Sequence, residues 1–321
     1  MMRRISHLSI FLLLLFLTLP AWAADSAQNM LAAGRVDDAI SALHGRLSSD
    51  PGDAESFNLL CRAYFALDDW ERAESSCRKA VSLEPDNSRF HLWLGRVYGE
   101  KADRANFLSA ASLAGKTRGE FQRAVDLNPK DMDARLDLAE FYLSAPGIVG
   151  GGQEKARAQA KVIGTVRPGW EHWIYARIAE KNKDMAAAES EYRQSVNFSH
   201  GDGEAWRNLA GFYRKQKRYA EMEQAIVKVS QAPLSRLDTL RDAAKTLLDS
   251  GRNYPFAVQL LRRYLDSGPV EEAPAFEVHY LLGTLLEKQG DKAGAAQEYR
   301  TSLSLARNFG LAQQALNRVA P

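Results

Sequence analysis

The sequence has few of the residues that build metal clusters or disulfide scaffolds. Its 321 residues include only two cysteines and six histidines, and a metal site built on the two cysteines would need further ligands. A chain of this length can bury a sizeable core without disulfides, as two ordinary domains or one repeat array. Hydrophobic residues make up 45% and charged residues 26% of the chain, which argues against disorder or a collagen-like structure.

The chain also lacks an excess of charge of one sign. Lysine and arginine total 42, against 40 for aspartate and glutamate. Subtracting Arg3 and Arg4, which lie in a segment that we expect to be removed, from the 42 leaves 40 of each sign. A balanced chain lacks the overall basic field that holds proteins on nucleic acid or anionic lipid, so we expect neither as a partner.

Long apolar runs are confined to the first residues. Residues 1–23 have two arginines, then an apolar stretch, and end in Ala21, Trp22 and Ala23, a pattern typical of a secretory signal peptide. The alternative is an uncleaved anchor, but the apolar run is shorter than the roughly 20 residues that span a bilayer. We expect cleavage after Ala23 and a soluble periplasmic or secreted protein without stable membrane insertion.

A repeat of 34 residues organises the rest of the chain. Asp50-Pro51 and Glu84-Pro85 each close an apolar helical segment, and the two prolines are 34 positions apart. Between them small and aromatic residues stand at fixed intervals, at Leu60, Cys61, Tyr64, Ala73, Cys77 and Ala80. A small residue lets two helices cross closely, a tyrosine fills the volume beside the crossing, and proline stops the second helix.

The same spacing recurs along the chain, with clear matches at Leu94, Gly95 and Tyr98, at Leu138, Ala139 and Tyr142, at Leu209, Ala210 and Tyr213, and at Leu282, Gly283 and Tyr299. This pattern resembles the tetratricopeptide repeat family. The resemblance implies an all-α fold, a right-handed superhelical solenoid of helical hairpins. We expect a partial N-terminal repeat at 24–53, seven repeats at 54–309 with insertions near 100–119 and 144–153, and a C-terminal capping helix at 310–321.

The two cysteines fall within one repeat. Cys61 lies at the close helix crossing and Cys77 on the second helix of the same hairpin, 16 residues later. Two interpretations remain open, a disulfide or a reduced pair packed in the core. A bond would stabilise the fold by roughly 3 kcal/mol through loop closure.

Motifs that resemble catalytic or cofactor sites have simpler explanations. Gly115-Lys116-Thr117 resembles the end of a phosphate-binding loop but lacks the earlier glycine and the preceding strand. The glycine-rich segment 147–152 lacks dinucleotide-binding spacing and is interpreted as a turn. His91, His172 and His279 are too far apart for a local metal pair, so we interpret them as packing residues. We therefore expect no enzyme, no cofactor and no metal.

Two insertions depart from the period. Pro129 follows Pro85 by 44 residues and Pro168 follows Pro129 by 39, and both insertions should join the two helices of their hairpins. We expect them to bring Phe107, Leu108 and Leu113 beside Pro146, Ile148 and Val149. Two interpretations compete: a structural ridge, which we favour, or an exposed docking patch formed by Phe107, Leu108, Ile148 and Val149.

The first helices of the repeats should line a concave groove. Their inward faces are predicted to carry Asn58, Arg62, Arg96, Glu140, Trp170, Trp173, Arg177, Arg207, Arg214, Tyr280 and Lys288. Arginine grips carboxylates with two hydrogen bonds and tryptophan offers stacking area, so an extended or acidic peptide is the expected ligand. The alternative is a solvated charged face.

The sequence therefore predicts a non-catalytic exported scaffold that binds peptide or protein segments in its groove. This function is an analogy from the fold. Alternatives are an assembly factor of an envelope machine, such as a pilus, secretion or cytochrome maturation system, an enzyme with a nonstandard site, and a thiol-redox protein that uses Cys61 and Cys77.

Overall fold

The computed structural model describes residues 22–319, and within them it contains seventeen α-helices and no strand. The predicted signal segment, residues 1–23, lies outside this range except for its last two residues. No helix in the described part combines the length and the apolar composition that crossing a membrane requires.

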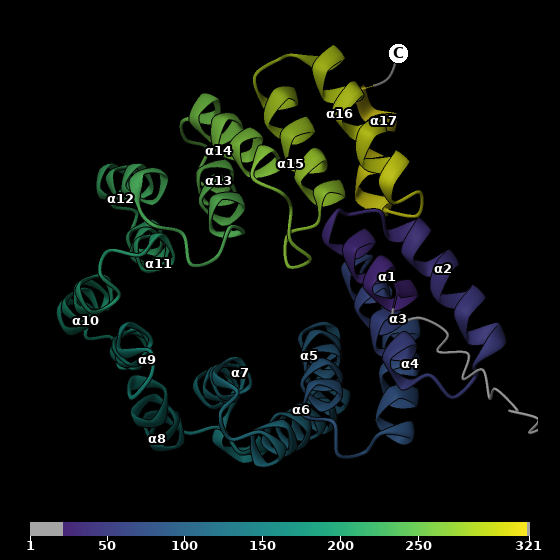
Figure 1. The fold of residues 1–321 in the computed structure, drawn as a ribbon. Coiled ribbons are helices and arrows are strands. Elements are labelled where there is room, and N and C mark those ends of the chain that lie inside the picture. Colours follow the sequence, from purple (N-terminus) through teal and green to yellow (C-terminus); the bar gives the residue numbers. More distant parts are fainter. Residues whose placement is uncertain (1–21, 320–321) are drawn as a thin grey trace, which may run out of the picture.

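Consecutive helices form antiparallel pairs (Figure 1). The pairs are α1 (Trp22–Ala32) with α2 (Val36–Ser49), α3 (Ala54–Ala66) with α4 (Trp70–Leu83), α5 (Ser88–Arg104) with α6 (Phe107–Leu127), α7 (Met132–Ser144) with α8 (Gln153–Gly164), α9 (Pro168–Lys181) with α10 (Met185–Phe198), α11 (Gly203–Lys215) with α12 (Tyr219–Gln231), α13 (Thr239–Asp249) with α14 (Tyr254–Asp266), and α15 (Ala275–Lys288) with α16 (Lys292–Leu305). The final helix, α17 (Gly310–Val319), packs on the last pair. The segment interpreted as a partial first repeat thus holds two helices.

Acidic and amide side chains begin most of these helices. Asp53 accepts a hydrogen bond from the backbone N–H of Ser56, and Asp131 accepts from the N–H groups of Asp133 and Ala134. These caps satisfy amides at the helix start that have no partner within the helix. With a proline turn before them, the caps explain why the helix boundaries follow the repeat.

Small residues allow the helices of a pair to cross closely. A methyl group added at Gly95 would lie 2.5 Å from the ring of Phe121, and one at Gly283 would lie 2.5 Å from the ring of Tyr299. Both aromatic rings are buried. The predicted crossing geometry is therefore present in the second and the last full hairpins.

The same crossing in the first full hairpin is covalently fixed. Cys61 of α3 and Cys77 of α4 form a disulfide, with Cα atoms 5.1 Å apart, and both residues are fully buried. The sequence left open whether the two cysteines are bonded or reduced, and in the structure they form a disulfide.

The insertions do not form a pair of long loops. The extra residues near 100–119 lengthen both helices of their hairpin, so that α5 has 17 residues and α6 has 21, joined only by Ala105 and Asn106. The sequence from Phe107 onward contains no proline before Pro129 and is rich in alanine, which favours helix. The shorter insertion is a compact turn that contains a 3-10 helix, η1 (Gly147–Val149).

The solenoid closes on itself, which the sequence did not predict. Figure 1 shows the first helices beside the last ones, around an open centre. One buried cluster joins Leu31 and Val36, near the start of the chain, to Phe276, Phe309 and Ala312, near its end. The α17 cap therefore packs against the last hairpin and also against the first helices.

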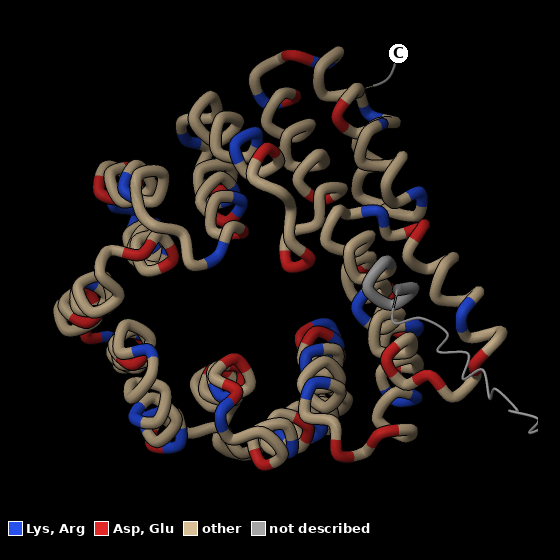
Figure 2. The backbone as a smooth tube through the Cα atoms, viewed as in Figure 1, with Lys and Arg blue, Asp and Glu red and all other residues tan. Residues whose placement is uncertain are grey.

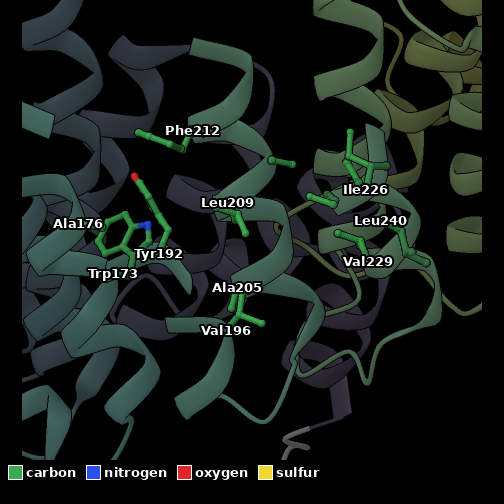
Figure 3. Close-up of a cluster of buried hydrophobic side chains, with 14 of the residues drawn as sticks. Trp173, Ala176, Tyr192, Val196, Ala205, Leu209, Phe212, Ile226, Val229 and Leu240 are labelled. Carbon is green, nitrogen blue, oxygen red and sulfur yellow. The ribbon is translucent and has the colours of Figure 1, made fainter. Parts of the chain in front are cut away.

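The rest of the core runs along the ring between the two ends. Figure 3 shows part of it, where Trp173 of α9, Tyr192 of α10, Leu209 of α11 and Ile226 of α12 contribute to one continuous cluster. Each hairpin thus buries its apolar faces against its neighbours, as stacked repeats do.

Candidate functional site

The centre of the ring holds a cavity of about 900 Å³. Its wall is made by α3, α5, α7, α9, α11, α13 and α15, the first helices of successive pairs, with the connection between α14 and α15 and part of α17. A second cavity of about 800 Å³ adjoins it and shares Trp170, Glu204, Arg236, Asp238 and Glu272. The two together form a path from the centre of the ring toward the loops that precede α9, α11 and α13.

The structure places only part of the predicted groove on this wall. Seven of the predicted residues line the cavity: Arg62, Arg96, Glu140, Trp170, Arg207, Tyr280 and Lys288. Four others do not: Asn58, Trp173, Arg177 and Arg214. Trp173 is buried in the core, as Figure 3 shows, and Asn58 is fully buried. Some residues that a helical wheel places on the inward face are therefore covered by the neighbouring hairpin.

Carboxylates of the chain itself lie near most of the predicted arginines, although the Nε atoms of Arg207 and Arg214 are buried without a hydrogen-bond partner in the described part of the chain. The Nε of Arg96 lies 2.6 Å from Asp137, Arg207 lies 3.7 Å from Asp242, and Arg214 lies 3.8 Å from Asp249. Each of these pairs joins the first helix of one hairpin to the first helix of the next. The arginines thus also connect neighbouring repeats, a role that the sequence did not predict.

Acidic residues outnumber basic ones on the cavity wall. The ten acids are Asp68, Asp137, Glu140, Glu204, Asp238, Asp242, Asp249, Glu271, Glu272 and Glu277, and the six bases are Arg62, Arg96, Arg207, Arg236, Lys245 and Lys288. Figure 2 shows acidic positions on the inward side of the ring, including the tip of the connection between α14 and α15. The sequence could not give this excess, because many of these acids come from elements that only the closed ring brings together.

Three of these acids are available to a ligand. The side chains of Asp68, Glu140 and Glu272 make no ion pair within residues 22–319, and all three residues are exposed to the solvent in the cavity. Enclosure within the ring raises the pKa of Glu140, and the neighbouring Asp137 raises it further. A cation placed beside Glu140 would relieve this cost, because an opposite charge stabilises the ionised carboxylate.

Burial raises the pKa of Glu204 to about 7, and the charges of Asp238 and Asp202 add to the effect. The positive charges of Arg207 and Arg236, which lie 3.7 and 3.9 Å from the carboxylate of Glu204, act to lower this pKa. The charge of the cavity therefore changes near neutral pH.

A short turn reaches from the cavity rim to Arg62. Residues 270–273 form the turn, with a hydrogen bond from the N–H of Ala273 to the carbonyl of Val270. The hydroxyl of Tyr264 accepts from the N–H of Val270 and donates to the carbonyl of Ala273. Glu271, at the tip, receives two hydrogen bonds from the guanidinium of Arg62, one of them 2.6 Å from Nε. This turn places two adjacent glutamates in the cavity.

The indole of Trp93 lies between two of the cavity arginines. The guanidinium carbon of Arg62 is 5.3 Å from the ring centre, and that of Arg96 is 4.8 Å from it. Such cation–π contacts hold both side chains in place. Sequence reasoning missed this aromatic contact, because Trp93 was not assigned to the groove.

The three histidines interpreted as packing residues share one arrangement. His91, His172 and His279 each lie on the first helix of a pair and bond through Nδ1 to a glutamate of the second helix, at 2.5, 2.7 and 2.7 Å. The hydrogen bond to Glu120 raises the pKa of His91. No group of three metal-ligating side chains occurs among the residues that the structure describes.

The predicted insertion patch is not brought together as one surface. Phe107, Leu108 and Ile148 are 84, 80 and 92% exposed, and Val149 is half-buried. Gly150, next to η1, lies against Arg118 of α6. Phe107 begins the same helix 11 residues earlier, roughly 16 Å away along its axis. The apolar tip of α6 and the short turn are therefore separate features.

Comparisons with known proteins agree with this architecture. Tetratricopeptide repeat family models match residues 30–92 and 241–308. Superkiller complex protein 3 of Mus musculus is 25% identical over 225 residues, which cover 59% of this chain and 14% of that protein. This chain thus matches about a seventh of the length of that relative.

Solved structures give the same fold. Yeast Tom70 aligns with a TM-score of 0.55 at 13% identity, over 92% of this chain and 63% of that chain. PilW, described as a widely conserved type IV pilus biogenesis factor, aligns with a TM-score of 0.50 at 13% identity, over 65% of this chain and 91% of that chain. The helical pairs and their stacking define a solenoid of the repeat class. With the family matches at both ends, the chain is a tetratricopeptide repeat protein.

Proposed function

We propose that this protein is a non-catalytic, exported scaffold that binds a basic segment of a partner protein in its central cavity. The observation that carries the proposal is the excess of acids on the cavity wall, ten against six bases. Three of these acids, Asp68, Glu140 and Glu272, face the cavity without an ion pair in the described structure. Charges of opposite sign steer and orient binding partners.

The adjoining cavity supports a ligand that is a chain segment. Its lining includes Val166 and Phe198, which are 63 and 49% exposed, the acids Asp202 and Glu272, and Asp133, which is paired with Arg167 of the same lining at 2.8 Å. Apolar side chains of a bound segment would cover Val166 and Phe198, while its lysines or arginines would reach the carboxylates. An extended basic segment with interspersed apolar residues fits this path better than the acidic peptide expected from the sequence.

Binding of labelled peptides tests the proposal. Two peptides of about 12 residues, long enough to span roughly 40 Å when extended, share apolar positions, and one carries lysine and arginine where the other carries glutamate. Fluorescence anisotropy should show saturable binding of the basic peptide, weakened at least tenfold by Glu140→Gln combined with Glu272→Gln. Glu154→Gln is the matched control, because Glu154 is 90% exposed on α8 and outside the cavity.

The alternative outcome is equally defined. Preference for the acidic peptide, lost on charge reversal at the cavity residues Arg207 and Lys288, would reject a basic ligand and support the acidic ligand expected from the sequence. Binding of neither peptide would reject the cavity as a peptide site of either charge.

The export part of the proposal rests on residues 1–23 and gains support from the disulfide. Bonds such as Cys61–Cys77 persist in oxidising compartments, of which the bacterial periplasm is one. Fusion of residues 1–30 to a reporter enzyme that is active only after export should give activity, and Arg3→Glu with Arg4→Glu should reduce it. An inactive fusion would contradict export.

Two alternative functions receive less support. A redox role needs an accessible thiolate, and both cysteines are bonded and fully buried. A role as an assembly factor of an envelope machine is compatible with a scaffold, and the likeness to PilW is a likeness of fold. Affinity capture from an envelope extract, with the Glu140 and Glu272 double variant as control, would distinguish this role by the identity of the partner.

A further inference from the structure

The central cavity already contains one arginine that is held by a tryptophan and a glutamate together. The guanidinium carbon of Arg62 lies 5.3 Å from the centre of the Trp93 ring, and its nitrogens donate two hydrogen bonds to the carboxylate of Glu271, one of them at 2.6 Å. The planar guanidinium suits both contacts, because it stacks on an aromatic face and forms paired hydrogen bonds with a carboxylate. This arrangement shows how the ring holds an arginine.

The same two residue types occur where the two cavities meet, but there they hold no arginine of the chain. Trp170 and Glu272 each line both cavities. Within residues 22–319, no lysine or arginine lies over the ring of Trp170 or pairs with the carboxylate of Glu272. Glu271 and Glu272 are adjacent in one turn, so one carboxylate binds the chain's own arginine while the next one stays unpaired.

Both Trp170 and Glu272 are held in place by residues behind them. Trp170 is half-buried, and its ring centre lies 5.1 Å from that of the buried Trp173, with the two ring planes at 74°. The backbone carbonyl of Glu272 accepts a hydrogen bond of 2.6 Å from Arg241, which fixes the turn and leaves the carboxylate free. A ligand therefore meets groups that are already positioned, which lowers the entropy cost of binding.

The cation nearest to this junction is already engaged. Arg236 lines both cavities, and it donates hydrogen bonds of 3.2 and 2.7 Å to the carboxylate of Asp238, which lines them as well. The charges of this pair cancel. The remaining acids of the junction, Glu204 and Glu272, leave it with a net negative charge.

We infer that the junction binds an arginine side chain of the partner segment, with its guanidinium stacked on Trp170 and paired with Glu272. This inference rests on the proposed function for the segment that carries the arginine. An acidic wall alone attracts lysine and arginine alike, whereas a tryptophan face combined with a carboxylate favours the planar guanidinium over the compact ammonium group. Trp170 and Glu272 thus determine which basic segments bind.

The test compares a basic peptide whose cations are all lysine with its single lysine-to-arginine variants, by fluorescence anisotropy. We expect one variant to bind at least fivefold more tightly than the all-lysine peptide. Trp170→Leu and Glu272→Gln should each remove this preference, and Trp170→Phe should keep part of it, because a phenyl ring still stacks on a guanidinium. The matched control is Trp206→Leu, since Trp206 is partly buried and lies outside both cavities.

Two results would overturn the inference. One is equal affinity of the natural protein for all the peptides. The other is a loss of affinity in Trp170→Leu that is the same for every peptide and leaves the preference for arginine unchanged, because that result would assign Trp170 a structural role only.

A small probe separates this inference from the proposed function. N-acetyl-arginine amide should shift the NMR signal of the Trp170 indole N–H saturably, and N-acetyl-lysine amide should shift it less; the signal is assigned by its absence in Trp170→Phe. If this shift is seen but no peptide binds, the arginine site stands and the proposed segment fails. If the peptides bind without any preference for arginine, the proposed function stands and this inference fails. Absence of the shift would also reject the arginine site.

Discussion

Asp37 and Arg307 are 270 residues apart in the sequence, yet the carboxylate of Asp37 accepts hydrogen bonds from both the backbone N–H and the Nε of Arg307, at 2.8 and 3.0 Å. This contact joins the start of α2 to the link between α16 and α17. A solenoid of stacked hairpins ordinarily leaves its two ends apart, because each repeat contacts only its neighbours. Here the ends meet, and the groove becomes a cavity.

The ring closure predicts a specific effect of Gly34→Ala. The added methyl group would lie 2.6 Å from the backbone nitrogen of Ala275, so the two ends must move apart. Small-angle X-ray scattering should show a larger radius of gyration. The matched control is Gly290→Ala, which has a similar positive φ, 88° against 74°, but no atom of the described structure within 4 Å of the added methyl group. An unchanged radius for Gly34→Ala would contradict ring closure in solution.

The disulfide should contribute strongly to stability. Replacing Cys61 and Cys77 together by alanine removes a bond that closes a loop of 16 residues, and we expect the free energy of unfolding to fall by about 3 kcal/mol. Urea denaturation measures this directly. Reductant should destabilise the natural protein by a similar amount and leave the double variant unchanged. Equal stability of the two proteins would show that the bond contributes nothing.

The helix crossings should tolerate no added side chain. Gly95→Ala places a methyl group 2.5 Å from the ring of Phe121, and relieving such overpacking typically costs about 1–3 kcal/mol. Gly99→Ala is the control on the same helix, because its methyl group meets only Thr117 at an ordinary 3.7 Å. We expect the control to be neutral or stabilising, since alanine favours helix. A thermal melt in which both variants behave alike would refute the close crossing.

The pairing of His91 with Glu120 predicts a pH-dependent stability. The hydrogen bond to Glu120 raises the pKa of His91 above its usual 6.5 in the folded state, so the stabilisation is fully present below pH 6.5 and is lost as the pH rises through the raised pKa. His91→Gln should therefore lower the melting temperature more at about pH 5.5 than at about pH 8.5, on either side of the ordinary histidine pKa. An equal loss at both pH values would mean that His91 contributes by packing alone.

The repeat architecture could be predicted because its signals are local. Gly95 leaves room for an aromatic ring of the same hairpin, Pro85 follows the end of one helix, and Asn87 caps the start of the next. All of these interactions lie within a few residues or one hairpin. These residues act through sterics and hydrogen bonds that recur from one hairpin to the next. The family and fold expected from the sequence were confirmed for this reason.

The closed ring could not be predicted because its closure depends on the sum of the small rotations between successive hairpins. Each hairpin turns slightly against the previous one, and whether the ends meet depends on the total over the whole chain. No feature of Arg62 or Glu271 shows in the sequence that they pair over 209 positions. The excess of acids in the cavity could not be predicted for the same reason: Arg96 is visible on its helix, but its partner Asp137 and the 270–273 turn come from other repeats.

The cavity acids predict how ligand binding depends on pH. Burial raises the pKa of Glu204 to about 7, and the charged form of this residue favours a cation beside it, so a basic segment should bind more tightly as the pH rises from about 6 to about 8. Within residues 22–319 no histidine lines the central cavity, but His200 lines the adjoining one, so the measurement is repeated on His200→Gln. Binding should also release protons near neutral pH, because a nearby positive charge lowers the pKa of a carboxyl group. Titration calorimetry in two buffers of different ionisation enthalpy measures that release. Glu204→Gln should abolish the pH dependence while the fold is retained, whereas a dependence that survives this substitution would assign it to another group.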